Sequence, residues 1–296
     1  MFPKYCTING NMQKIEIRIV RNRNTLFKMY YDFTQEKRKK AFFNTILVTA
    51  KAVTWRINMR ILVVNDDGIT SEGIKRLAQL AARFGEVWVV APDDQCSAMS
   101  QKITVRGDMK VKRIDFPVPA VQAYSVGGTP ADCVKAALYH LMPERPDIVF
   151  SGINYGYNCG YDILYSGTVG AAMEALSAGI PAIAFSKEMN DIYDVVDEYI
   201  LPITKELLDN MPATSEIWNV NFPGCTLDEV KGIIWDAKPA QMEYYSDHYI
   251  REDYEDGSFS LTAAGLPVTD APENTDIRYV LDRYISIGKI KSHIIK

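Results

Sequence analysis

The chain has 296 residues, of which 24% are charged, and a formal net charge of −4. Its composition is that of a globular protein without a run of about 18 apolar residues, so we expect neither a transmembrane helix nor a membrane partner. The charge is uneven, because residues 1–58 carry 12 Lys and Arg against 3 Asp and Glu, whereas the remainder carries 21 against 34. An acidic body argues against a nucleic-acid polymer as partner but admits a small anionic substrate held through a metal.

The five Cys and three His are scattered along the sequence. No Cys-x-x-Cys pair occurs, so the spacing supports neither a zinc site nor a disulfide framework. With so few His, a His-based metal centre or a Ser/His/Asp triad is disfavoured. Reduced thiols are typical of the cytoplasm, where we expect this protein to act.

Residues 1–58 form a basic segment that differs in composition from the rest of the chain. The segment contains no Ser and no smooth apolar core, so it matches neither a transit peptide nor a secretory signal. We therefore predict an N-terminal extension over 1–58 and a functional domain over 59–296 that begins at Met59. The extension is interpreted as upstream sequence included by a misplaced start, with a real accessory segment as the alternative.

Strands and helices alternate from Arg60 onward. The continuous apolar, β-branched run over 61–64 predicts a strand buried on both faces. The apolar spacing over 71–84 predicts a helix, and 87–91 predicts the second strand. The later pattern predicts a hairpin over 103–114, strands over 121–126, 147–150 and 182–185, and helices over 129–141 and 168–178. This alternation indicates an α/β fold, a three-layer sandwich with a mostly parallel, Rossmann-like sheet.

After about Trp235 the pattern changes to extended hairpins rich in Tyr and charge. Asp256-Gly257 is a turn signal, and residues 236–275 are predicted to form a C-terminal β-hairpin arm. A hairpin gains little stability alone, and tyrosine suits an interface, so we expect the arm to build an oligomer. A hairpin on the surface of its own subunit is the alternative. A late strand is predicted over 284–287.

Two adjacent carboxylates, Asp66 and Asp67, follow the first strand of the predicted domain. Gly68 would let the backbone turn tightly beside them. Two anions so close repel each other, so either one is raised in pKa and stays protonated or a cation holds both. Oxygen ligands favour hard ions such as Mg, Mn or Ca, which indicates metal-assisted chemistry on a phosphate. The alternative is a pair that only caps the next helix.

Three further polar loops follow strands or precede a helix, so all could reach one edge of the sheet. Residues 92–100 offer hydroxyls and carboxylates, and residues 151–160 offer recurring Gly and Asn, whose amides can ligate a hard metal or donate to phosphate. Residues 165–172 open a helix, where hydroxyls and free amides form an anion site. Ordinary loop geometry and a simple helix cap are the competing readings.

Five motifs in order, NDDG, PDxxxS, GGTPADC, SGINYGYN and YSGTVGAAMEA, resemble those of the SurE family, the survival protein E nucleotidases. The resemblance runs from Met59 to nearly the C-terminus. It implies a metal-dependent phosphatase that hydrolyses nucleoside 5′-monophosphates and 3′-monophosphates with one divalent cation, such as Mg or Mn, per subunit. Members of the family exchange C-terminal segments, which implies a homodimer or homotetramer.

The resemblance also implies roles for particular residues. The matched metal ligands are Asp66, Asp67, Ser97 and Asn154. The matched phosphate-facing positions are Asn158, Ser166, Gly167 and Thr168. Asp66 or Asp67 would orient or deprotonate the nucleophile, and the sequence leaves open whether water or a carboxylate attacks phosphorus. Asp94-Gln95-Cys96 stands where many relatives carry basic residues, so no Arg contact from that loop is expected.

Two other classes compete with this interpretation. A dinucleotide-binding oxidoreductase needs Gly-x-Gly-x-x-Gly in its first turn, which here holds two carboxylates. A Mg-binding receiver-type signalling domain also places an acidic pair after its first strand, but it needs an Asp where a central strand here ends in Ser151. Lys187 could mimic the receiver lysine. The preferred base, the 5′ or 3′ position and the natural metal are not fixed by the sequence.

Overall fold

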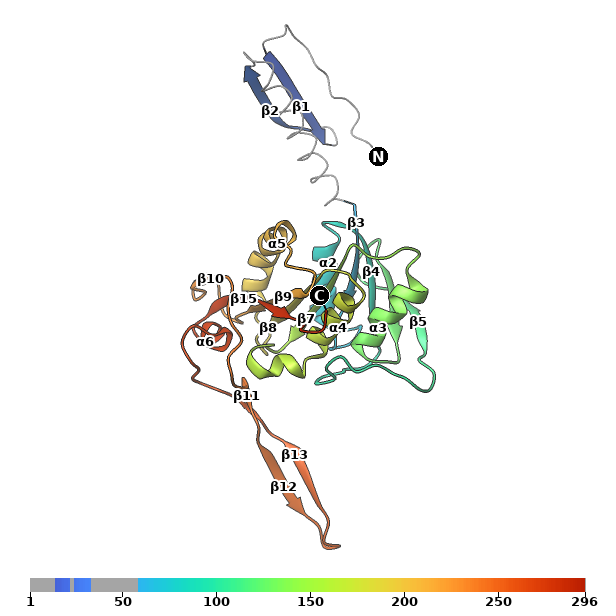
Figure 1. Cartoon of the computed structure of the whole chain (residues 1–296), viewed down its shortest axis with the longest axis vertical. Helices are drawn as coiled ribbons and strands as arrows, with labels where there is room; N and C mark the ends of the chain where they lie inside the picture. The colour runs from blue at the N-terminus through green and yellow to red at the C-terminus, as the bar shows by residue number, and fades with distance from the viewer. Residues whose placement is uncertain (1–13, 22–23, 33–57, 296) are drawn as a thin grey trace. The chain divides into compact units, whose positions relative to one another are not determined.

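The computed structural model describes residues 14–21, 24–32 and 58–295 (Figure 1). The chain divides into two compact units, 1–56 and 57–296. In the first unit, β1 (Lys14–Arg21) pairs antiparallel with β2 (Asn24–Asp32). The remainder of the predicted extension lies outside the described residues, so its interpretation stays a prediction. None of the helices in the described part of the chain combines the length and apolar character needed to cross a bilayer.

The second unit is built on a nine-stranded sheet. Its strands are β3 (Met59–Val64), β4 (Gly85–Pro92), β5 (Val111–Ile114), β6 (Gln122–Val126), β7 (Ile148–Tyr155), β8 (Ala182–Lys187), β9 (Glu216–Phe222), β10 (Gly232–Ile234) and β15 (Tyr284–Lys291). Their spatial order is β10-β15-β9-β8-β7-β3-β4-β6-β5. The pairs β9–β15 and β5–β6 are antiparallel, and the other neighbours are parallel. The predicted, mostly parallel α/β sheet is confirmed.

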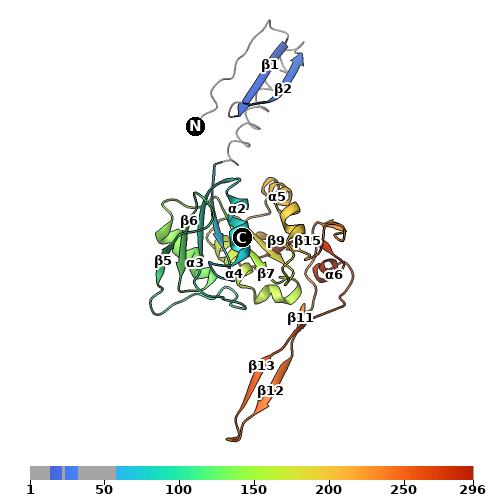
Figure 2. The ribbon, with the colours of Figure 1, turned by 180° about the vertical axis from the view of Figure 1, so that it is seen from behind.

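Helices cover both faces of this sheet (Figures 1 and 2). They are α2 (Glu72–Ala81), α3 (Pro130–Ala136), the π-helical η1 (Ala137–Leu141), the 3-10 helix η2 (Gly160–Leu164), α4 (Gly167–Ser177), α5 (Asp194–Asp209) and α6 (Asp276–Leu281). Buried residues of α2 and α5 share one hydrophobic cluster, and those of α3 and α4 share another. The three-layer sandwich is thereby confirmed.

Strand β3 shows why its sequence is a continuous apolar run. Ile61 and Val63 pack in the cluster with α2 and α5, while Leu62 and Val64 pack in the cluster with α3 and α4. All four side chains are fully buried. Alternate residues of a strand point to opposite faces, so a strand covered on both sides must be apolar throughout.

The predicted hairpin over 103–114 is wrong. Only the segment Val111–Ile114 forms a strand, β5, and its partner is β6. Thr104 instead donates its backbone N–H and its hydroxyl to the Asp132 carboxylate, at 2.9 and 2.8 Å. The Asp132 side chain, from a helix distant in the sequence, therefore binds the Thr104 N–H that a hairpin would have used in its strand ladder.

The arm consists of two short antiparallel ladders. At its base β11 (Tyr245–Ser246) pairs with β14 (Leu266–Pro267), and beyond it β12 (Tyr249–Asp253) pairs with β13 (Phe259–Ala263). The turn passes through Asp256-Gly257 as predicted, and Gly257 has a φ of +82°. Figure 1 shows this hairpin projecting from the sandwich, and its strands are exposed along almost their whole length.

Candidate functional site

The acidic pair lies at the carboxyl end of β3, in a turn that the neighbouring side chains hold in place. Gly68 has a φ of +91°, a conformation that favours glycine. The Asn65 side-chain amide donates to the Gly68 carbonyl at 3.0 Å and to the Ser71 hydroxyl at 2.8 Å. The Cys96 backbone N–H donates to the Asp66 carbonyl at 2.7 Å, which joins the loop after β4 to the pair.

Asp66 is a buried carboxyl group, with only 4% of its surface exposed. Its Oδ1 accepts a hydrogen bond from the Thr168 hydroxyl. Burial raises the pKa of Asp66 to about 7, with a further rise from the charge of Asp67, while the Thr168 bond opposes the rise. Without a cation, the conflict between the two carboxylates is therefore relieved by holding a proton on Asp66 at neutral pH or below.

Asp67 is positioned by the strand next to its own. Its Oδ2 accepts a hydrogen bond from the Tyr155 backbone N–H at 2.9 Å. Burial raises its pKa, and the Tyr155 bond opposes that rise. The pair thus presents one carboxyl that is held by the helix opening at Ser166 and one that is held by the end of β7.

A pocket of about 510 Å³ opens beside Asp66. It collects most of the predicted site residues from four separate segments of the chain. Those on its lining are Asp66, Ser97, Asn154, Asn158 and Ser166. Asp67, Gly167 and Thr168 are not on that lining. Asp67 is linked to it because its carboxylate accepts a hydrogen bond from the backbone N–H of Tyr155, which does line the pocket.

Gly167 and Thr168 lie against Asp66. A Cβ added at Gly167 would lie 2.9 Å from the Asp66 Cβ and 3.0 Å from its Oδ2, so only glycine allows this approach. Thr168 is fully buried and donates its hydroxyl to Asp66. In this structure the Thr168 hydroxyl binds Asp66, and the phosphate-facing role that the resemblance implies for Gly167 and Thr168 stays a prediction.

Ser166 caps α4 and also lines the pocket. Its Oγ accepts the Val169 backbone N–H at 3.0 Å, which is the simple capping role considered from the sequence. Because the oxygen accepts that bond, the hydroxyl proton of Ser166 stays available for a ligand. The first backbone N–H groups of a helix have no partner within the helix, so this end of α4 suits an anion.

Asn158 is held by two residues that the sequence analysis did not identify. Its backbone N–H donates to Asn221 Oδ1 at 2.9 Å, and its carbonyl accepts from the side-chain amides of Asn219 at 2.9 Å and Asn221 at 3.2 Å. Its own amide donates to the Ser186 hydroxyl at 2.7 Å. The signal was present, since Asn-x-Asn in a strand places both side chains on one face.

The donor atoms around the acidic pair fit a hard divalent cation. The Asn154 amide nitrogen donates to the Gly156 carbonyl at 2.8 Å, which leaves its Oδ1 free to act as a ligand. Carboxylates, a hydroxyl and an amide oxygen are the ligands that Mg or Mn prefers. In the described ranges no three His, Cys, Asp or Glu gather as a metal site. The implied set contains only two carboxylates, so it does not depend on such a group.

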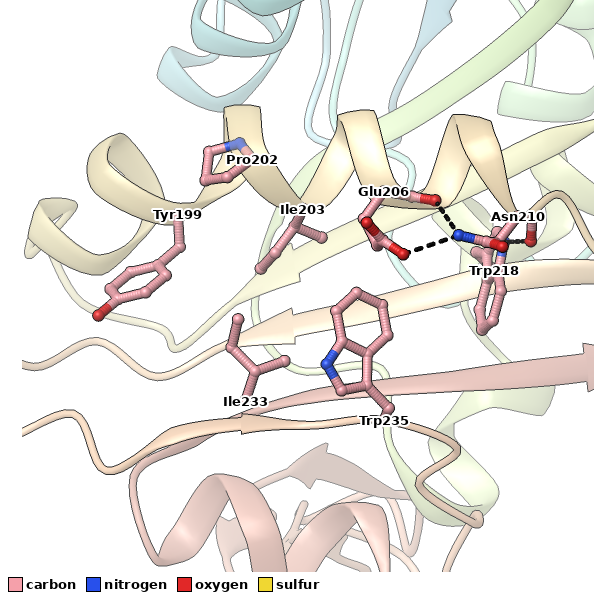
Figure 3. Close-up of a pocket in the computed structure, with 8 residues that line it drawn as sticks. All are labelled: Tyr199, Pro202, Ile203, Glu206, Asn210, Trp218, Ile233 and Trp235. Atoms are coloured by element: carbon pink, nitrogen blue, oxygen red, sulfur yellow. Dashed lines mark hydrogen bonds between the residues drawn. The ribbon is translucent and has the colours of Figure 1, made fainter. Parts of the chain in front are cut away.

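A second pocket, of about 640 Å³, lies between α5 and the edge strands (Figure 3). Tyr199 and Ile203 of α5 face Ile233 and Trp235 across it. Among its described lining residues, the one carboxylate is Glu206, which accepts a hydrogen bond from the Asn210 side chain at 2.8 Å. An apolar groove with one carboxylate lacks the paired charges that phosphate chemistry with a metal needs, so this pocket is not the candidate site.

The first pocket has a further wall that the sequence analysis did not assign to the site. Residues at the base of the arm contribute Glu243, Tyr245, Asp247 and Tyr249. From the sequence, this segment was predicted to build an oligomer, with a hairpin on its own subunit as the alternative. No local pattern marks these residues, because their place in the site depends on how the arm leaves the sandwich.

Comparison with known proteins identifies the family. The family described as Survival protein SurE matches residues 61–244. A protein named 5′-nucleotidase SurE from Clostridium botulinum (strain Kyoto / Type A2) is 38% identical over 233 residues, covering 77% of this chain and 91% of the relative. One with the same name from Brevibacillus brevis is 45% identical over 206 residues, covering 66% and 77%.

A crystal structure of the SurE protein from Aquifex aeolicus has the same architecture. It superimposes with a TM-score of 0.67 and 34% sequence identity, covering 78% of this chain and 93% of that one. The sequence matches and the shared sandwich agree with the motif order noted above. The chain belongs to the SurE family.

Proposed function

We propose that this protein is a metal-dependent 5′-nucleotidase, which hydrolyses nucleoside 5′-monophosphates, and also 3′-monophosphates, to nucleoside and phosphate. The relatives named 5′-nucleotidase support the nucleotidase activity. The single observation that carries the proposal is the pocket in which buried Asp66 meets the oxygen atoms of Ser97, Asn154 and Ser166. Such a site suits a phosphate ester and a hard cation.

One divalent cation per subunit, Mg or Mn, would be held by Asp66, Asp67, Ser97 and Asn154. When bound, it would neutralise phosphate charge and acidify a water molecule. The chain's own groups complete the site. The Ser166 hydroxyl and the free N–H groups at the start of α4 would donate to phosphate oxygens, which stabilises charge as it develops. Asn158, fixed by Asn219 and Asn221, would hold the substrate from the other side.

One carboxylate of the pair would orient or deprotonate the nucleophile. Burial raises the pKa of Asp66 to about 7 when no cation is bound, whereas a bound cation would favour the ionised form, which can accept a proton or orient the nucleophile. Asp67 keeps its orientation through the Tyr155 N–H. One oxygen of the two carboxylates would then accept the proton while the other oxygens bind the cation.

The receiver-type alternative is not supported. Ser151 stands at the position where a receiver carries its phosphoacceptor, and its hydroxyl donates to the Thr168 carbonyl at 2.7 Å. Lys187, the candidate for a receiver lysine, donates to the Glu188 carbonyl at 2.6 Å and to Asn190. Its ammonium group is therefore committed to a loop outside the acidic pair.

The arm supports the proposal of a homodimer or homotetramer. On its two-stranded ribbon the hairpin exposes Phe259 and Leu261 on one face and Ile250 on the other. Large apolar groups exposed in this way mark interaction surfaces. Light scattering of the full chain should give a dimeric or tetrameric mass. A monomeric mass at micromolar concentration would contradict this part of the proposal.

Phosphate release from adenosine 5′-monophosphate tests the activity. Full-length protein treated with EDTA and then freed of chelator should be inactive, and added Mn or Mg should restore turnover. Repeated turnover also excludes a single stoichiometric phosphorylation. Undiminished activity after exhaustive chelation would refute metal dependence, and no release in any metal would refute the nucleotidase.

A further inference from the structure

The pocket that collects the oxygen ligands is also lined by large apolar and aromatic side chains. Besides the buried Tyr157, they are Tyr155, Tyr165, Met189, Tyr245 and Tyr249. Four of these residues expose between 41% and 59% of their surface, Tyr245 being the exception. Large apolar groups around a pocket with a few polar atoms are the usual lining of a small-molecule site.

Tyr245 forms a fixed wall. Its ring packs edge-on against the Tyr244 ring, with 4.9 Å between the ring centroids. Tyr244 packs in the same way against Tyr157, with 5.2 Å between the centroids. Tyr157 and Tyr244 are buried, and the Asp162 carboxylate accepts both the Tyr244 and Tyr245 backbone N–H groups, at 3.0 and 3.1 Å. The base of the arm is therefore anchored to the sandwich before any ligand binds.

Tyr165 and Tyr249 present free aromatic rings. Within the described part of the chain, neither ring has an aromatic or cationic partner. The backbone of Tyr165 is nonetheless fixed, since its carbonyl accepts the Ser100 N–H at 2.8 Å. Tyr165 also directly precedes Ser166, the capping residue of α4, so an aromatic ring adjoins the proposed phosphate site. A flat, uncharged group attached to the phosphate would find these rings within the same pocket.

Charge fixes which part of a substrate can reach the arm. Glu243 and Asp247 line the pocket, and among the described residues neither has a hydrogen-bond or ion-pair partner. Two free carboxylates disfavour a second anionic group there, because like charges repel. The phosphate therefore belongs at the start of α4, and the part of the substrate beside the arm carries no negative charge. At about 510 Å³ the pocket is within the roughly 300–1,000 Å³ of small-molecule sites.

We propose that Tyr165 and Tyr249 form the nucleobase subsite of this pocket, with Tyr245 as its fixed wall. This inference rests on the proposed nucleotidase function and assigns residues of the arm to substrate recognition. Every base has a flat π-face, so recognition by stacking tolerates changes of base. The protein should accordingly accept purine and pyrimidine nucleotides, and the contribution of the base should be lost when the rings are removed.

Three phosphate esters separate the parts of the substrate. Adenosine 5′-monophosphate carries base and sugar, ribose 5-phosphate carries the sugar alone, and glycerol 2-phosphate carries neither. With full-length protein and Mn, Tyr249→Ala and Tyr165→Ala should each lower the ratio of kcat/KM for the nucleotide to that for ribose 5-phosphate by about tenfold, which is about 1.4 kcal/mol. The loss should be mainly in KM. Tyr249→Phe and Tyr165→Phe keep the ring and should restore the ratio.

The matched control is Tyr139→Ala. Tyr139 is also a tyrosine with 71% of its surface exposed, and it lines a different pocket beside η1. This variant should leave the kinetics of all three esters unchanged. Equal losses on nucleotide and ribose 5-phosphate, or no change in the ratio, would overturn the subsite.

A binding measurement keeps the subsite testable if the proposed activity fails. Calorimetry with adenosine 5′-monophosphate in EDTA, which should prevent turnover, should show an affinity about tenfold weaker for Tyr249→Ala than for the wild type. Wild-type protein that hydrolyses no ester refutes the nucleotidase, whereas unchanged nucleotide affinity in both alanine variants refutes the subsite. The two failures are therefore distinguishable.

Discussion

One pocket is lined both by residues at the carboxyl ends of the sheet strands, here called the sheet edge, and by residues of the arm. At the sheet edge, Asp66 and Asn158 are buried and bonded to neighbouring groups. On the arm, Glu243, Asp247 and Tyr249 line the pocket without such partners among the described residues. Groups that are bonded in advance need no rearrangement when charge develops, whereas free groups gain their contacts from a ligand. The sheet edge is therefore suited to catalysis and the arm to recognition.

The largest effect should follow from changing the sheet edge at Asp67. Asp67→Asn removes a charge from the proposed metal site and should lower kcat/KM for adenosine 5′-monophosphate by about 100-fold or more. The fold should persist, because relieving a repelling pair does not destabilise the metal-free protein. Steady-state kinetics and circular dichroism check both parts. Asp108→Asn, at an exposed loop position, is the matched control and should be fully active.

Asn221 offers the next test, because it bonds both the N–H and the carbonyl of Asn158. Asn221→Ala leaves the buried Asn158 N–H without its partner, while the Asn158 carbonyl keeps the Asn219 amide, and should cost about 1–3 kcal/mol of unfolding free energy. It should also lower kcat/KM by about tenfold by loosening Asn158. Urea unfolding and kinetics measure the two effects. Asn190→Ala is unsuitable as a control, because Asn190 is half-buried and also binds Lys187. Asn58→Ala, at an exposed bend before β3, serves instead. A wild-type-like Asn221→Ala enzyme would show that Asn158 needs no support.

The pH dependence of stability tests the burial of Asp66. Its pKa is about 7 in the folded protein against 3.8 without burial. Between these values the folded state holds a proton that the unfolded state has lost, so the unfolding free energy of the metal-free protein should fall as pH rises from about 4 to about 7. Asp66→Asn cannot titrate and should flatten that part of the curve. Denaturant unfolding in EDTA measures both proteins; parallel curves would show that Asp66 is not the group responsible.

The smallest effect should come from the N-terminal segment. A protein that begins at Met59 keeps the 61–244 region matched by the family together with the arm. It should therefore show unchanged kcat/KM and an unchanged unfolding midpoint. Loss of folding or of most activity would show that residues 1–58 support the body.

The parts of the fold predicted from sequence are those specified by local pattern. The buried strand at 61–64 and the helices predicted over 71–84 and 129–141 depend on neighbouring residues, and the structure contains them, with Ser71 and Thr129 as their N-caps. Helix α5 was not predicted, because Pro202 lies inside it. Its buried apolar face, packed in the cluster with α2, sustains the helix despite the lost N–H. Strand β9 was also not predicted, because its position in the sheet depends on strands that are distant in the sequence.

The site divides in the same way. Adjacent carboxylates and a helix-opening Ser are visible in the sequence because they lie within single motifs. Asn219 and Asn221 support Asn158 across more than 60 residues of sequence, and the tyrosines of the arm reach the pocket only through its tertiary path. Contacts between distant segments have no local signal. The sequence therefore indicated the residues proposed for the metal and the phosphate, but not the residues of the arm that line the pocket.

A titration of Mn into metal-free protein, followed by calorimetry, tests the central claim most directly, since it measures the oxygen-lined site without relying on turnover. We expect one Mn bound per subunit of the wild type, and binding weakened by at least about tenfold in Asp67→Asn. Asp108→Asn should bind like the wild type. Equal stoichiometry and affinity in wild type and Asp67→Asn would contradict the assignment of the acidic pair as the metal site.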